Sequence, residues 1–192
     1  RRYQPDYSNH IIYNNSMNTS YRHLLTAASV ALMATIGLSA TAQEKQEERK
    51  LQKAKVTFVT GTQPTGKEGA AMVADGHKWT KWCIDAPQEM PYHVTIDAAK
   101  AITPKAYGLV TAEDTHYYPT RNPIAWNVYG SNDLKEWTTL DEVKYDRRMR
   151  DENEQTYLFR IKESKAWRYY KFEFTRMTEG TRLQLSEIEI YE

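Results

Sequence analysis

Residues 121–140 read RNPIAWNVYGSNDLKEWTTL and carry a clear strand signal. Trp126 and Val128 fall on one face of an extended segment, and the polar Asn127 falls on the other. Alternation with a period of two is typical of a strand that has one face in a core. The turn-forming pair Asn132-Asp133 follows and ends the run. The stretch therefore predicts a half-buried strand followed by a turn.

The same period of two recurs along most of the chain after residue 55. Besides 125–131, alternating runs lie at 56–60, 92–97, 106–111, 137–143, 155–161, 168–175 and 182–191. Turn formers separate several of these runs, and no long amphipathic helix interrupts them. Eight short strands without helices predict an all-β fold, an antiparallel eight-stranded jelly-roll β-sandwich.

The last of these runs contains an irregularity. Leu183 and Leu185 occupy odd positions, whereas Ile188 and Ile190 occupy even ones. Strict alternation cannot bury all four, so we expect a change of face at Ser186-Glu187, through a bulge or a crossing between sheets. A carboxylate at such a switch can leave the sheet and meet a ligand, and the alternative is a glutamate that faces solvent.

The balance of charge and the single cysteine exclude several classes of protein. The 192 residues include 26 Lys and Arg and 25 Asp and Glu, so the chain lacks the basic excess of a domain that coats nucleic acid. One cysteine, Cys83, cannot form a disulfide framework or a cysteine zinc site. Zinc-protease, serine-hydrolase and phosphate-loop motifs do not occur in the sequence. We therefore expect no enzyme and no nucleic-acid partner, and we expect Cys83 to be a buried thiol.

Residues 17–42 have the pattern of a secretory signal peptide. A short polar stretch precedes an uncharged, mostly apolar run at 24–40, and residues 40–42, Ala-Thr-Ala, offer small side chains for cleavage. The alternative is a membrane anchor, but about 17 apolar residues lie at the short limit for crossing a bilayer. We expect cleavage before Gln43, no membrane span after processing, and a secreted, periplasmic or cell-surface protein.

The flanking segments complete the expected organisation of the chain. Residues 1–16 precede Met17 and are best explained as an over-extended gene start. Residues 43–55 are charged and lack aromatic side chains, as expected of a solvated linker or a short helix. Residues 56–192 then form one domain, which is long enough to bury a full core.

Three stretches together carry a resemblance to a known family. Residues 74–82 read ADGHKWTKW and are similar to an Asp-Gly-x-x-x-Thr-x-Trp segment, and residues 185–191, LSEIEIY, are similar to a closing strand. Between them, residues 126–140 match Trp-x-(aliphatic)-x-Gly-Ser-Asn-Asp-(three residues)-Trp-x-x-Leu. Over 68–192 the chain thus resembles the discoidin domain, also called the coagulation factor V/VIII type C domain. That domain belongs to the galactose-binding-like superfamily with the family 32 carbohydrate-binding modules, so the resemblance implies an eight-stranded jelly roll.

The resemblance also implies a structural calcium ion at the Asp-Gly turn. The matching donors are Asp75, the carbonyl oxygen of His77, Thr80 and, from the last strand, Glu187. All of them offer oxygen, which is the ligand atom that calcium prefers. His77 stands where relatives more often have Asp or Asn, and this departure affects the possible metal site. The alternative is a metal-free turn in which Asp75 accepts bonds from backbone amides and Thr80 caps the turn.

Two predicted loops have the composition of a sugar-binding site, which needs an aromatic platform beside polar donors and acceptors. One loop contains Trp79, at residues 77–79. The other is 113–121, and its candidate ligand-binding residues are His116, Tyr117, Tyr118 and Arg121. Arg121 has two open roles, because it could brace its loop or contact the ligand.

Four of the five tryptophans divide into two groups. Trp82, Trp126 and Trp137 match core positions of the family and are expected to be structural. Trp79 matches no core position, so we expect its ring to be exposed. An exposed ring of this kind would suit the apolar face of a sugar.

These observations predict a secreted, non-catalytic module that binds glycan or polysaccharide, in a bacterium. The leading alternative is a discoidin domain that binds protein or anionic lipid, although the loops lack the apolar clusters of lipid binders. A third reading is an accessory fragment of a glycan-degrading hydrolase. The charged segment 144–154 is expected to be a solvated loop in which Arg147, Arg148 and Arg150 could touch an acidic glycan.

Overall fold

The computed structural model describes residues 41–86, 88–162 and 165–192. The expected gene start at 1–16 and most of the expected signal peptide at 17–42 therefore lie outside the described residues. By its contacts the chain divides into two units, residues 1–50 and 51–192. In the first unit, residues 41–48 are helical. Within the described part of the chain, no helix combines the length and the apolar character that a bilayer crossing requires.

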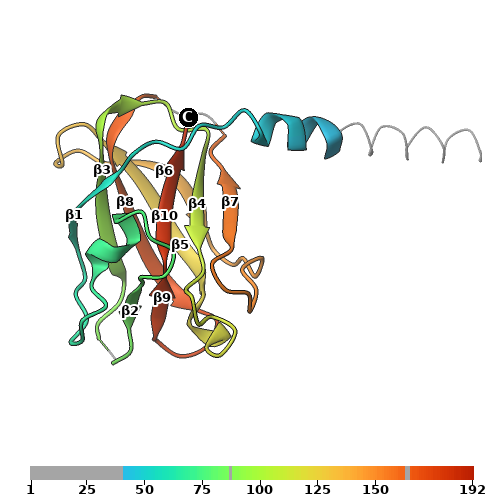
Figure 1. The fold of residues 1–192 in the computed structure, drawn as a ribbon. Helices are drawn as coiled ribbons and strands as arrows, with labels where there is room; N and C mark the ends of the chain where they lie inside the picture. Colours follow the sequence, from blue (N-terminus) through green and yellow to red (C-terminus); the bar gives the residue numbers. More distant parts are fainter. Residues whose placement is uncertain (1–40, 87, 163–164) are drawn as a thin grey trace, which may run out of the picture. The chain divides into compact units, whose positions relative to one another are not determined.

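The second unit is built from β-strands, with all strand pairs antiparallel (Figure 1). The strands of the described residues are β1 (Thr57–Gly61), β2 (Trp82–Ile84), β3 (Tyr92–Ile102), β4 (Ala106–Val110), β5 (Pro123–Ser131), β6 (Thr138–Val143), β7 (Thr156–Arg160), β8 (Trp167–Met177), β9 (Leu183–Leu185) and β10 (Glu187–Tyr191). Two short 3-10 helices lie between strands, η1 (Ala70–Ala74) and η2 (Pro119–Arg121). The expected all-β fold is confirmed.

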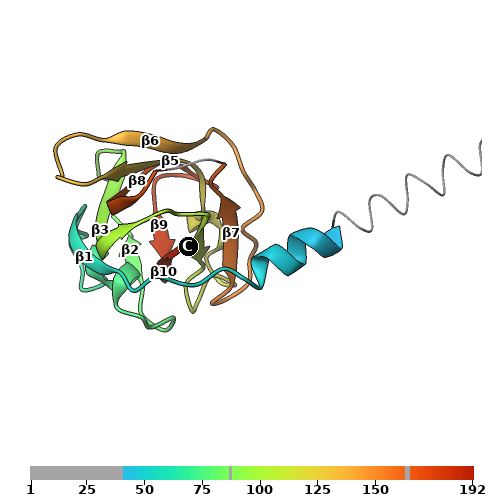
Figure 2. The ribbon, with the colours of Figure 1, turned by 90° about the horizontal axis from the view of Figure 1, so that it is seen from above.

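The strands form two layers around one core. A five-stranded sheet in the order β1-β3-β8-β5-β6 faces a three-stranded sheet in the order β10-β4-β7, and β2 pairs with β9 (Figure 2). Trp82, Trp126, Tyr107 and Phe172 are fully buried between the layers. Burial of such large aromatic side chains is the main favourable contribution to folding, because it removes the most apolar area from water.

The strands differ from the sequence prediction mainly at three places. The strand expected at 92–97 continues to Ile102 in β3. Three residues form β2, which is too short for a period of two to be visible. The single run expected at 182–191 is split at Ser186 into β9, which pairs with β2, and β10, which pairs with β4. The chain thus crosses from one sheet to another at this residue. The four apolar side chains of the run, Leu183, Leu185, Ile188 and Ile190, are all fully buried, so the expected change of face is confirmed.

The segment just before β1 lies along the free edge of β10. Ala54 donates its backbone N–H to the carbonyl of Ile190 at 2.8 Å, and the ammonium of Lys53 lies 3.1 Å from Glu189. Gln52 and Glu192 exchange backbone bonds at 3.0 Å. These residues belong to the segment that the sequence suggested as a charged linker, and they cover an edge that would otherwise be open to pairing.

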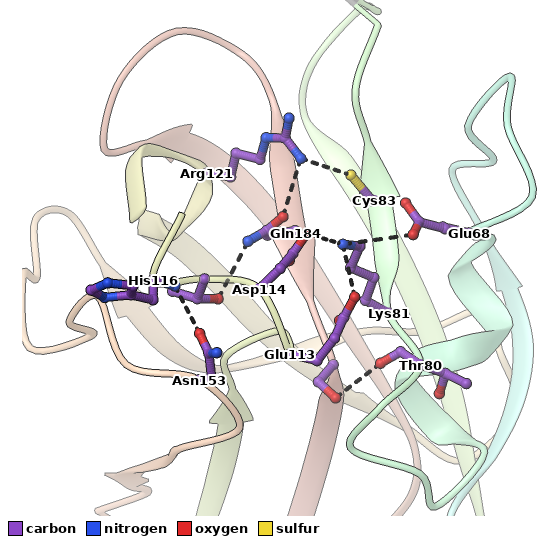
Figure 3. Close-up of polar contacts among 12 residues, drawn as sticks. Glu68, Thr80, Lys81, Cys83, Glu113, Asp114, His116, Arg121, Asn153 and Gln184 are labelled. Atoms are coloured by element: carbon purple, nitrogen blue, oxygen red, sulfur yellow. Dashed lines mark hydrogen bonds and ion pairs between the residues drawn. The ribbon is translucent and has the colours of Figure 1, made fainter. Parts of the chain in front are cut away.

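A buried lysine holds the loops at one end of the sandwich (Figure 3). Lys81 is only 6% exposed, and its ammonium lies 2.5 Å from Asp114, 3.1 Å from Glu113 and 3.6 Å from Glu68. Burial alone would lower the pKa of Lys81, but the hydrogen bonds to Asp114 and Glu113 outweigh it and raise the pKa. A permanently charged ammonium thus ties the segment 113–121 to the start of β2.

Removing this ammonium should destabilise the fold. In the parent protein, one carboxylate oxygen of Glu113 and one of Asp114 are buried without a hydrogen-bond partner. Lys81→Met would also remove the cation that both carboxylates contact. Loss of one member of a buried ion pair lowers the free energy of unfolding by about 3 kcal/mol, which urea unfolding would detect. The control is Lys144→Met, since that lysine is 82% exposed and pairs with Glu142 at 3.7 Å; it should change stability by less than about 0.5 kcal/mol. Equal stability of both variants would contradict the anchoring role.

The approach of β8 to β5 leaves no room for a side chain at Gly130. A Cβ atom there would lie 2.6–2.8 Å from ring atoms of Trp167. Gly130→Ala should therefore lower the free energy of unfolding by about 1–3 kcal/mol, because the ring must shift. Gly66→Ala is the matched control, since no atom lies within 4 Å of its added Cβ. Chemical denaturation of the two variants, side by side, tests the packing.

Candidate functional site

The last strand holds the turn that follows η1. Glu187, the first residue of β10, is 5% exposed. Its Oε1 atom accepts hydrogen bonds from the backbone N–H groups of Gly76 and His77, each at 2.9 Å. The backbone of Glu187 stays in β10, but its side chain turns away from the sheet to the turn at Gly76 and His77. The alternative of a glutamate that faces solvent is therefore wrong.

Ser186 completes the same attachment. Its hydroxyl donates to the carbonyl oxygens of Lys78 and Thr80, at 2.5 and 2.9 Å. Ser186 lies between β9 and β10, where the strand is interrupted, so its hydroxyl can bond to the turn. The sequence located Ser186 at the switch but carried no signal for its partners, which lie more than a hundred residues away.

The expected metal residues do lie together in this turn. The Thr80 hydroxyl donates to Asp75 Oδ2 and to the carbonyl of His77, both at 2.8 Å. Asp75 Oδ1 also accepts the backbone N–H of His77 at 2.9 Å. These bonds are the ones expected of the metal-free turn, and they bring together the oxygens that calcium would use.

The two carboxyl groups of the turn influence each other. Burial, and then the neighbouring Asp75 carboxylate, raise the pKa of Glu187 to about 7, although the amides of His77 and Gly76 oppose the rise. Two neighbouring carboxylates repel each other, so the pair is stabilised either by a proton that the two share or by a bound cation. The chemistry of the site therefore fits a calcium ion, with two carboxylates, one hydroxyl and one carbonyl as donors.

The fit of a metal depends on oxygen atoms of the backbone and of Thr80. In the described part of the chain, no cluster of three or more His, Cys, Asp or Glu side chains is arranged to hold a metal. The His77 ring packs against Trp79 in a tilted arrangement with centroids 4.5 Å apart, and its Nδ1 lies 3.5 Å from Asp75. His77 would thus contribute its carbonyl oxygen, as the resemblance implied, and not its ring.

Three candidate ligand-binding residues expose large aromatic rings to solvent. Trp79 is 67% exposed, Tyr117 77% and Tyr118 44%. Trp82 and Trp126 are fully buried, which confirms the expected division between exposed and core tryptophans. Trp137 departs from it, since it is only half-buried and lies over Lys171 on the outer side of the five-stranded sheet.

The two aromatic loops meet at the turn before β7. The Lys78 ammonium donates to the carbonyl of Glu154 and to the Thr156 hydroxyl, both at 3.2 Å. On the other side, Asn153 Oδ1 accepts the backbone N–H of His116 at 2.8 Å (Figure 3). The turn at 153–156 therefore brings the loop of Trp79 and the loop of Tyr117 to one end of the molecule.

Arg121 and Tyr118 form a separate part of this end. The guanidinium of Arg121 lies 4.0 Å over the Tyr118 ring and donates to Gln184 Oε1 at 3.3 Å. The same nitrogen lies 3.6 Å from the sulfur of Cys83, which is buried as expected. Burial raises the pKa of Cys83 to about 11, so its thiol is neutral. Arg121 therefore braces its loop, which is one of the two roles that the sequence left open, and its side chain is partly exposed; contact with a ligand stays a prediction.

Solved structures of sugar-binding modules share this fold. The Clostridium perfringens module CpGH89CBM32-5, in complex with GalNAc-β-1,3-galactose, is 14% identical, with a TM-score of 0.57 over 72% of this chain and 94% of that one. The family 32 module of Clostridium perfringens NanJ, in complex with galactose, is 15% identical, with a TM-score of 0.55 over 71% and 99%. A chitosan-binding module from a Paenibacillus chitosanase/glucanase is 15% identical, with a TM-score of 0.57 over 73% and 99%. At these identities the likeness concerns the fold, and it confirms the expected jelly roll.

Comparison by sequence gives the family. No curated protein matches the chain. Residues 72–191, which run from η1 to the end of β10, match the family model described as Sad1 / UNC-like C-terminal. This match covers the Asp-Gly turn, the strand that carries Trp126 and the closing strand, the three stretches on which the resemblance to discoidin domains rests. The chain therefore belongs to the Sad1/UNC-like C-terminal family and has the discoidin-like, galactose-binding-like fold of the family 32 carbohydrate-binding modules.

Proposed function

We propose that this protein is a secreted, non-catalytic module that binds glycan through the loops around Trp79 and Tyr117. The observation that carries the proposal is the exposure of three aromatic rings, Trp79, Tyr117 and Tyr118, on loops held in place by polar contacts. Exposed rings are costly in water unless a ligand covers them. Three such rings at one end of the sandwich support the presence of a binding surface there.

A sugar has the chemistry to cover such rings. Its apolar C–H face can lie against an aromatic ring while its hydroxyl groups bond to polar side chains nearby. His116 packs against Tyr117 with ring centroids 5.5 Å apart, and His77 packs against Trp79. Each ring thus has an imidazole beside it that can donate or accept a hydrogen bond. The modules of the same fold that were solved with galactose and with GalNAc-β-1,3-galactose support this ligand class.

Two features favour glycan over the other functions considered. The large exposed hydrophobic side chains of these loops are Trp and Tyr, whose rings carry an N–H or O–H group at one edge. The exposed large aliphatic side chains of the described residues are Val59, on β1, and Leu134, which follows β5. That argues against insertion into lipid. The acids nearest to the aromatic loop, Glu113 and Asp114, are engaged with Lys81, which argues against a pair of catalytic carboxylates.

The affinity for a single sugar chain should be modest, because polar pairing with a glycan largely exchanges one hydrogen bond to water for another. We expect a Kd from about ten micromolar to about one millimolar. A glycan array probed with the full chain, followed by calorimetry on the hits, tests the proposal. Binding of neutral or acidic glycans supports it. An array without any hit, while a protein or lipid ligand is captured, would overturn it.

Trp79→Ala should separate binding from stability. We expect it to weaken glycan binding at least about tenfold, since the stacking surface is lost. Stability should change by less than about 0.5 kcal/mol, because the ring is exposed. Trp137→Ala, at the opposite end of β5 and β6, is the control and should leave the affinity unchanged. A stable Trp79→Ala protein with the parent affinity would show that the site assignment is wrong.

We also propose that the turn at Asp75 holds a structural calcium ion, supported by its two carboxylates and by the oxygens of Thr80 and His77. An ion that binds only the folded state adds about 2.7 kcal/mol at a hundredfold excess over its Kd. The melting temperature should therefore fall in chelator and recover with calcium. Glu187→Gln keeps an oxygen for the two backbone amides but removes the charge, so it should abolish the calcium response.

The pH dependence of stability in chelator gives a second test. The pKa of Glu187 rises from an ordinary 4.5 to about 7 on folding. The folded state therefore binds this proton more tightly, and the resulting stability is full below pH 4.5 and lost as the pH rises through 7. Bound calcium should remove this loss, and Glu187→Gln should flatten it. Urea unfolding at several pH values, with calcium and with chelator, checks both; identical curves in the two conditions would exclude the ion.

A further inference from the structure

A pocket of about 430 Å³ opens beside the aromatic loops, between η2 and the turn that joins β8 to β9. Its walls are Tyr118, Thr120, Arg121, Glu179, Gly180, Thr181 and Arg182. Backbone bonds fix the two segments to each other, from Glu179 N–H to the Thr120 carbonyl at 3.0 Å and from Thr178 N–H to the Asn122 carbonyl at 2.9 Å. The pocket is therefore built by the fold, with backbone rather than flexible side chains setting its width.

Arg121 is held rigidly in the wall of this pocket. Its Nη1 donates to the side-chain oxygen of Gln184, which is fully buried and is itself fixed by a bond from its amide to the Thr115 hydroxyl at 3.3 Å (Figure 3). The Tyr118 ring supports the guanidinium from one face. A guanidinium fixed in this way loses little conformational freedom when it binds an anion, which favours affinity.

The positive charge of Arg121 has no compensating carboxylate among the described residues. The acceptors of its hydrogen bonds are the neutral amide of Gln184 and the thiol of Cys83. The arginines of the described residues that form ion pairs are Arg148, with Asp146 at 2.8 Å, and Arg168, with Asp97 at 2.8 Å. Arg121 and Arg182 together outweigh the single acid of the pocket wall, Glu179, so the pocket is positively charged.

We propose that this pocket binds the carboxylate of a uronic acid residue, so that the glycan taken by the module is acidic. A planar carboxylate matches the fork of donors on a guanidinium, and charge-assisted bonds of this kind are about twice as strong as neutral ones. The Tyr118 ring belongs to the wall of the same pocket and is 44% exposed, so a sugar ring next to the carboxylate could contact it. This proposal rests on the proposed function and adds the substrate class to it.

The sequence suggested a different basic segment, 147–150, and that suggestion stays a prediction. Within the loop 147–150, Arg148 is bound to Asp146 and packs over Phe159 at 4.4 Å. Arg150 uses its backbone carbonyl and N–H to hold the side chains of Asn122 and Tyr157. Arg121, on η2, and Arg182 also form no ion pair among the described residues, and both line the pocket.

The test compares acidic polysaccharide fragments with their neutral counterparts. Oligomers of polygalacturonate, alginate and hyaluronan, each paired with its carboxyl-reduced form, are titrated into the full chain by calorimetry. The parent should bind at least one acid form about tenfold more tightly than its reduced form, as expected for one charge-assisted pair. Raising the salt concentration should reduce this preference.

Variants assign the preference to the pocket. Arg121→Gln and Arg182→Gln should each reduce the tenfold preference for the acid form, and Arg182→Gln, which is exposed, should do so without affecting folding or the affinity for the reduced form. Glu179→Gln removes the opposing charge and should increase affinity for the acid form alone. Arg168→Gln, whose guanidinium is bound to Asp97, is the control and should change neither affinity.

The possible failures are distinguishable. Equal affinity for acid and reduced forms, or a preference that survives both Arg121→Gln and Arg182→Gln, would overturn the pocket assignment while the glycan function stands. Loss of binding to acid and reduced forms alike in Arg121→Gln, with an unchanged melting temperature, would also overturn it, because the guanidinium would then serve any sugar. If the parent binds no glycan in the array, both this inference and the proposed function fail.

Discussion

The crossing of the last strand from one sheet to the other is the constraint on which the rest of the structure depends. At Ser186 the chain leaves the pairing with β2 and begins the pairing with β4, so that two pairs of apolar residues of opposite parity are all buried. The break frees the Ser186 hydroxyl and the Glu187 carboxylate, which bond the turn 76–80 more than a hundred residues away. Burying a carboxylate is unfavourable, and two backbone amides offset that penalty here.

The loops at this end are held by charged and polar anchors, not by burial of their own aromatic side chains. Here Lys81 binds Glu113 and Asp114, and Lys78 binds the turn at 153–156, so the rings of Trp79 and Tyr117 stay outside. This division explains how a surface can be both ordered and apolar: the backbone is positioned by contacts that a ligand does not have to displace.

Fold and family by themselves do not identify the ligand. The solved structures at 14–15% identity share the sandwich with this chain, and a shared fold does not by itself specify the ligand. In this chain the loops combine exposed rings with an arginine that is braced by Gln184 and forms no ion pair among the described residues. The proposals for a glycan, and for an acidic one, therefore rest on side chains of this protein.

The sequence by itself determined most of the strands, the faces they bury and the change of face in the last strand, because alternation of side chains is a local property that each run carries within itself. The exposure of Trp79 was predicted from the family resemblance, in which this residue matches no core position. Only the tertiary structure decided which loops meet. The burial of Lys81 and Gln184, the three-residue strand β2 and the pocket of Arg121 depend on segments 30 to 110 residues apart, which no local pattern encodes. Their positions follow from the register of the sheets and the closure of the loops between them.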